Sequence, residues 1–78
     1  MTQALTKGYT MKRQFDMETF NAWVQDTQDY SMITDKDSYV ARKSNDAITY
    51  CTKVLGMIRL DAYIVANNVA IKEGIRLK

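Results

Sequence analysis

The stretch from Thr34 to Gly74 repeats apolar residues at alternating steps of three and four, and this spacing most constrains the fold. In a helix such positions share one side, as the a and d positions of a heptad do. No proline interrupts the stretch. We therefore expect one long helix over about residues 35–73. The series runs through Ala41, Ser44, Ile48, Cys51, Leu55, Ile58, Ala62, Val65 and Val69.

A second series with the same steps lies about 110° around the same helix. Together the two series form a broad face, which predicts contacts with at least two neighbouring helices. The second series runs through Ala47, Tyr50, Val54, Met57, Asp61, Ile64, Asn68 and Ile71.

Residues suited to helix ends flank this stretch. Thr34 is a candidate N-cap whose hydroxyl would accept from the amide of Asp37. The acidic side chains of Asp35 and Asp37 favour the positive end of the helix dipole. Gly74 suits the left-handed position that follows a last helical turn. These signals place the predicted helix between Thr34 and Gly74.

Two alternatives to the continuous helix stay open. The helix breaks near Ser44, which begins a second possible cap, or near Gly56, since a glycine inside a helix is unfavourable. Alternatively, the alternation from Ile58 to Val65 forms a strand, and Asn67-Asn68 makes a hairpin turn.

A shorter helix is expected over about residues 16–30. Asp16 is a good N-cap, and Phe15 and Phe20 have the spacing of a hydrophobic staple around it. Trp23 belongs to the apolar side of this helix, which indicates a role in the core.

The two helices predict an all-α helical hairpin that assembles as a homo-oligomeric bundle. The short helix covers only the first half of the long one, so the apolar second half needs another copy of the chain. Isolated polar residues on such a seam fix its register. The predicted oligomer interface comprises Leu55, Ile58, Asp61, Ala62, Val65, Asn68 and Val69.

The 78 residues suffice for one domain, with an arm at 1–14 and a helical domain at 15–78. A chain this short is marginally stable alone, which favours oligomerisation. A single cysteine and no histidine argue against a disulfide and a structural zinc site. The lone thiol, Cys51, suits a small buried side chain and a reducing cytoplasm. No segment is long and apolar enough for a membrane span.

The sequence contains no catalytic constellation and no phosphate loop, so we expect no enzyme and no cofactor. One alternative function is sequestration of a small anion, such as a nucleotide, at subunit interfaces. Another is a helix-turn-helix DNA regulator, for which the basic residues are poorly clustered. The candidate residues for binding a ligand or partner are Tyr9, Lys12, Arg13, Arg42, Lys43 and Arg59.

The favoured hypothesis is a small, homo-oligomeric, non-enzymatic interaction protein. It would bind a partner protein and modulate it, most simply by inhibition. Small size, a net charge of only +2 and an unpaired apolar surface support this hypothesis. Accessory proteins of viruses and mobile elements share these traits, which is an analogy between classes of protein.

Overall fold

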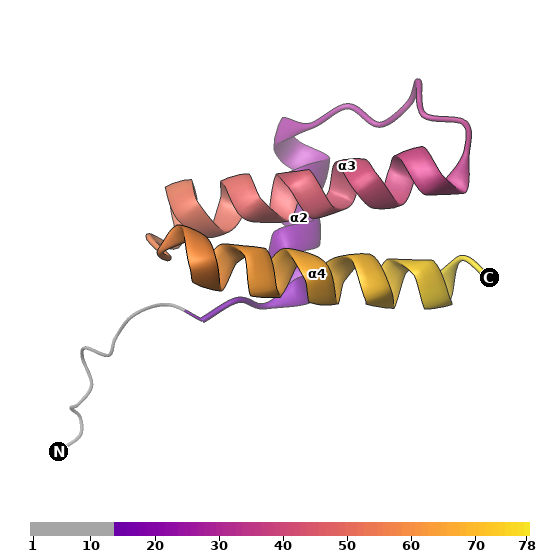
Figure 1. The fold of residues 1–78 in the computed structure, drawn as a ribbon. Coiled ribbons are helices and arrows are strands. Elements are labelled where there is room, and N and C mark those ends of the chain that lie inside the picture. Colours follow the sequence, from indigo (N-terminus) through magenta and orange to yellow (C-terminus); the bar gives the residue numbers. More distant parts are fainter. Residues whose placement is uncertain (1–13) are drawn as a thin grey trace, which may run out of the picture.

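The computed structural model describes residues 14–78, and these residues form an all-α fold (Figure 1). The elements are α2 (Met17–Thr27), α3 (Lys36–Thr49), a π-helical turn η1 (Tyr50–Val54) and α4 (Arg59–Arg76). In Figure 1, α3 and α4 lie side by side and run in opposite directions, while α2 crosses behind them. This part of the chain contains no strand, so the strand alternative at Ile58–Val65 is wrong.

The start of α2 follows the predicted local signals. Asp16 is the N-cap and accepts the backbone N–H of Thr19 at 2.9 Å. The Thr19 hydroxyl also donates to this carboxylate at 2.7 Å, and the two hydrogen bonds lower the pKa of Asp16 because they stabilise its ionised form. The Phe15 and Phe20 rings lie 5.3 Å apart across the cap, which confirms the predicted contact. The helix ends earlier than predicted, and the Asp29 side chain accepts the Ser31 amide in the turn that follows.

The predicted long helix is two helices, and the break lies at Gly56. The chain leaves α3 through the π turn, in which the amide of Leu55 donates to the carbonyl of Tyr50 at 3.1 Å. Gly56 then adopts a φ of +71°, a left-handed conformation that glycine reaches without strain. The amide of Met57 donates to the carbonyl of Cys51 at 2.8 Å and closes the turn. The second helix folds back along the first.

Two predicted helix ends are also corrected. Asp35, rather than Thr34, caps α3, because its carboxylate accepts the amide of Ser38 at 2.9 Å. Gly74 lies inside α4, which continues to Arg76, so the expected left-handed glycine is Gly56 instead. Gly74 was the residue predicted to end the long helix, and α4 continues past it.

All three helices contribute to one core. Phe20 of α2 is fully buried, and its ring lies 5.4 Å from that of Tyr50. Trp23 is half-buried and lies 5.2 Å from the same tyrosine ring, in agreement with its predicted core role. Small side chains let α3 and α4 approach closely. The buried apolar residues are Phe20, Val24, Ala47, Tyr50, Cys51, Leu55, Ala62, Ala66 and Val69.

Cys51 is completely buried in this core, and burial raises the pKa of its thiol. A protonated, inaccessible thiol behaves as a small apolar side chain, as predicted.

No helix within residues 14–78 has the length and apolar character needed to cross a membrane.

Candidate functional site

The outer face of α4 is the side of this helix that points away from the core, and it carries four large aliphatic residues. Leu60, Ile64, Ile71 and Ile75 are 69%, 60%, 52% and 68% exposed, respectively. At about 100° per residue, these positions lie roughly opposite the buried side of the same helix. The outer face of α4 is therefore a stripe with an apolar pair near each end, and nothing in the described chain covers it.

Polar residues occupy the middle and one edge of this stripe. Asn67 and Asn68 lie exposed at its centre, between Ile64 and Ile71. Asp61 and Lys72 project about 100° and 120° around the helix from Leu60, so they share one edge. Neither charged side chain forms an ion pair or hydrogen bond with residues 14–78. Within the described part of the chain, the stripe therefore has one unpaired acid, Asp61, and one unpaired base, Lys72, along the same edge.

The residues of the predicted oligomer interface divide between core and surface. Leu55, Ala62 and Val69 are buried within the single chain, because α4 folds back onto α3. Val65 is half-buried against the same core. The remaining three residues of that prediction are exposed: Ile58, Asp61 and Asn68.

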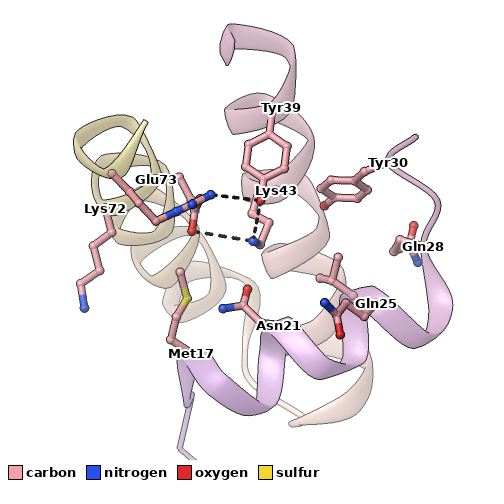
Figure 2. A pocket seen from close by; sticks show the side chains of 11 residues that line it. Met17, Asn21, Gln25, Gln28, Tyr30, Tyr39, Lys43, Lys72 and Glu73 are labelled. Atoms are coloured by element: carbon pink, nitrogen blue, oxygen red, sulfur yellow. Dashed lines mark hydrogen bonds and ion pairs between the residues drawn. The ribbon is translucent and has the colours of Figure 1, made fainter. Parts of the chain in front are cut away.

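A cleft of about 700 Å³ with charged residues in its wall opens between the three helices (Figure 2). Lys43 of α3 and Lys72, Glu73 and Arg76 of α4 line it, together with residues of α2. Asn21 of α2 points into the cleft in Figure 2, and its Oδ1 atom is buried without a hydrogen-bond partner in the described chain. The volume of the cleft lies within the range of small-molecule sites.

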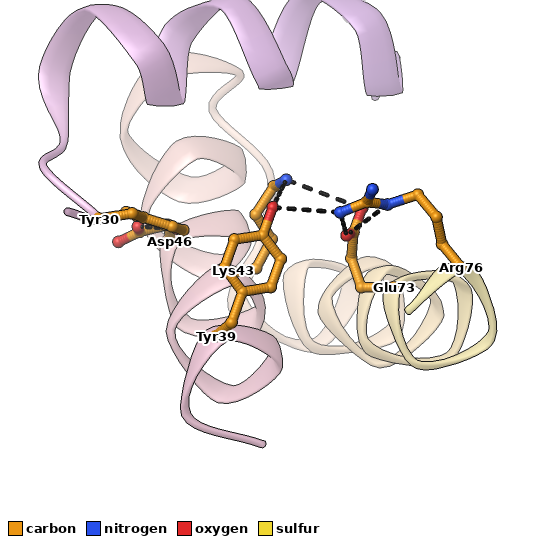
Figure 3. A network of polar contacts seen from close by, with 6 residues as sticks. All are labelled: Tyr30, Tyr39, Lys43, Asp46, Glu73 and Arg76. Atoms are coloured by element: carbon orange, nitrogen blue, oxygen red, sulfur yellow. Dashed lines mark hydrogen bonds and ion pairs between the residues drawn. The ribbon is translucent and has the colours of Figure 1, made fainter. Parts of the chain in front are cut away.

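Glu73 is the centre of the charged network in this cleft (Figure 3). Its Oε2 lies 3.7 Å from Nζ of Lys43, and its Oε1 accepts from Nε and Nη2 of Arg76 at 3.0 and 2.8 Å. Lys43 also donates to the hydroxyl of Tyr39 at 3.1 Å. Lys43 and Glu73 are only 5% and 3% exposed. This buried ion pair links α3 to α4.

A second network ties the segment between α2 and α3 to α3. The hydroxyl of Tyr30 donates to the carboxylate of Asp46, and burial raises the pKa of Tyr30 well above its usual value. Arg42 pairs with Asp46 at 3.3 Å and donates to Gln28 at 2.9 Å. The Arg42 guanidinium also lies 5.0 Å from the centre of the Tyr30 ring. These contacts fix the connection to the helix.

The predicted ligand-binding cations do not converge on one point. Arg42 is engaged in the network around Asp46, whereas Lys43 faces Glu73 in the cleft. Arg59 begins α4, fourteen residues before Glu73, which corresponds to about 21 Å along the helix. The other three predicted residues, Tyr9, Lys12 and Arg13, lie outside the described residues, as does most of the predicted arm at 1–14.

The helices also differ in arrangement from a helix-turn-helix. In that motif the two helices cross at about 90–120°, whereas α3 and α4 lie side by side (Figure 1). Within residues 14–78, no group of three acidic, cysteine or histidine side chains is placed to hold a metal ion.

Comparisons of the chain with protein-family models, with curated proteins and with solved structures give no match. The functional argument therefore rests on the residues of this chain.

Sequence reasoning missed most of the outer face of α4. Ile64 and Ile71 appeared in the second apolar series, but Leu60 and Ile75 were not assigned to any surface. The signal was present, because these four residues recur at steps of four, seven and four. Glu73, the buried partner of Lys43, gave no comparable signal, since its position depends on where α4 folds back.

Proposed function

We propose that this protein is a non-enzymatic interaction module that binds a protein partner through the outer face of α4. The observation that carries the proposal is the exposure of four large aliphatic side chains, each more than half exposed, along one side of a single helix. Exposed apolar patches of this kind typically mark surfaces that meet another molecule. A helix that presents such a stripe suits recognition by an apolar groove or by another helix.

The buried and networked charged side chains serve to hold the fold together. Lys43 and Glu73 neutralise each other in the interior, and Arg42 and Asp46 hold the connection between α2 and α3. The outer face of α4, rather than these charged groups, is therefore the surface through which the module acts.

Site-specific photo-crosslinking in cells tests the proposal. A benzophenone amino acid at Ile64 or Ile71 should give discrete products of higher mass, because both positions lie on the outer face of α4. The control positions are Asn45 and Lys53, which are exposed but belong to α3 and η1. Products that form equally at all four positions, or at none, would contradict a binding role for this face.

The cleft between the three helices supports a second candidate function, the binding of a small anion such as a nucleotide. Lys43, Lys72 and Arg76 line it against a single acid, Glu73, and Lys72 has no ion-pair partner within residues 14–78. The test is a thermal-shift measurement with a nucleotide panel. A ligand that binds the folded state raises the melting temperature. Lys72→Gln should abolish the shift, whereas Lys53→Gln should preserve it, and no shift with any nucleotide would reject this candidate.

A further inference from the structure

We infer that the occupant of the outer face of α4 is the same face of a second copy of this chain, paired antiparallel about a two-fold axis. The inference rests on the proposed function, because it names the partner of that surface. Three independent features of α4 support it: the order of the apolar residues, the placement of the unpaired charges and the position of the two asparagines.

The apolar stripe reads the same in both directions. Leu60, Ile64, Ile71 and Ile75 are separated by steps of four, seven and four, so reversal of the helix leaves the pattern unchanged. When two copies lie antiparallel, Leu60 of one faces Ile75 of the other, and Ile64 faces Ile71. A two-fold interface requires a surface that is complementary to itself. The outer face of α4 meets this requirement along its whole length.

The unpaired charges distinguish this arrangement from a parallel one. A two-fold axis perpendicular to the helices places the same edge of both stripes together. Asp61 of one copy then lies about 3 Å along the axis from Lys72 of the other, and this pair occurs twice. In a parallel dimer, Lys72 would instead lie beside Ala70 and Gly74 of the second copy, where no acid is available. Opposite charges in these flanking positions set the orientation of paired helices.

The asparagines lie at the centre of the antiparallel pair. Asn67 and Asn68 stand midway between Leu60 and Ile75, so the two-fold axis passes between them. An amide side chain both donates and accepts, so two copies of one asparagine can hydrogen-bond to each other across the axis. Polar residues at such positions fix the register of paired helices.

Residues 14–78 leave this face accessible. The buried side of α4 packs against α3 and α2, and the outer face points the other way. Helix α4 has 18 residues and is therefore about 27 Å long. A single pair of such helices buries less area than a standard interface, so the dimer should be weak and reversible.

Single cysteines test the pairing in the full chain. The background is Cys51→Ala, which removes the buried thiol, and circular dichroism checks that each variant remains helical. A short bis-maleimide should join Leu60→Cys to Ile75→Cys when the two proteins are mixed, giving a product of twice 9.0 kDa. It should also join Asn68→Cys to itself. Leu60→Cys alone, and the control Asn45→Cys on α3, should stay monomeric.

Each other outcome rejects the inference. A product from Leu60→Cys alone that exceeds the mixed product would show parallel pairing. No product from the mixed pair or from Asn68→Cys would show that copies do not meet on this face. If photo-crosslinks at Ile64 and Ile71 then join the chain to a different protein, the proposed function stands without the two-fold pairing. If those crosslinks fail as well, both proposals are wrong.

Discussion

Substituting alanine for each of the two glycines in the described region should change stability in opposite directions. Gly56 has a φ of +71°, and a Cβ there would meet no atom within 4 Å, so only the backbone conformation opposes a side chain. The left-handed conformation disfavours L-residues by about 1–2 kcal/mol, so Gly56→Ala should destabilise the fold by about 1 kcal/mol. Gly74 is helical with open space around it, and Gly74→Ala should stabilise by about 0.5–1 kcal/mol.

Thermal unfolding followed by circular dichroism measures both effects. For a domain of this size, 1 kcal/mol corresponds to about 4–8 °C in Tm, so Gly56→Ala should lower Tm by that amount. Gly74→Ala should raise it by somewhat less. A continuous helix through residue 56 predicts the reverse sign at Gly56, because alanine is the better helix former. An increase in Tm for Gly56→Ala would therefore refute the hairpin at this position.

Two further predictions concern the buried ion pair and the helix caps. Glu73→Leu should destabilise by about 3 kcal/mol or more, because it leaves Lys43 buried without a counter-charge. Lys43→Met should destabilise less, since Glu73 keeps its two hydrogen bonds from Arg76. The double variant should recover most of the stability that Glu73→Leu loses. Urea unfolding of the natural chain and the three variants measures these free energies, and additive losses would contradict an interaction between Lys43 and Glu73. Hydrogen bonds lower the pKa of Asp16 and Asp35 in the folded state. The two carboxylates therefore stabilise the fold fully above the unfolded-state pKa of about 4, and this contribution is lost as pH falls through the lower folded-state pKa. Asp16→Asn with Asp35→Asn should flatten the fall in Tm below about pH 4, and an unchanged pH profile would contradict this origin.

Local signals in the sequence predicted part of the fold. Asp16 and the two phenylalanines around it form a cap within a few residues, so neighbouring side chains determine its geometry. The all-α class followed from the helical spacing of the apolar residues. Thr34 and Asp35 both suit a cap, and the choice between them depends on which side chain reaches the amide of Ser38. Sequence spacing does not decide between adjacent candidates of this kind.

The break at Gly56 is harder to predict for a physical reason. An apolar series has the same spacing whether its partner is another chain or the other half of the same chain. The series through Leu55, Ala62 and Val69 was therefore assigned to an oligomer, whereas the hairpin buries these residues within one copy. The hairpin also decides which residues remain exposed, so the outer face of α4 becomes evident only when the fold is known.

The central claim is that two copies meet through the outer face of α4, and the mass of the chain in solution tests it most directly. The exposed fractions of Leu60, Ile64, Ile71 and Ile75 amount to roughly two and a half full side chains per copy. At about 2 kcal/mol for each fully buried side chain, burial of this surface on both copies would contribute about 10 kcal/mol to dimer formation. Subtracting at least about 4 kcal/mol for association leaves about 6 kcal/mol, which corresponds to a Kd of tens of micromolar.

Sedimentation equilibrium across about 10–500 µM brackets this Kd. The account predicts a reversible change from 9.0 kDa toward twice that mass for the natural chain. It also predicts a helical monomer at every concentration for Ile64→Lys with Ile71→Lys, and an unaffected dimer for the control pair Asn45→Lys with Thr49→Lys on α3. A natural chain that stays at 9.0 kDa throughout, or a dimer that survives the two lysines on α4, would contradict the central claim.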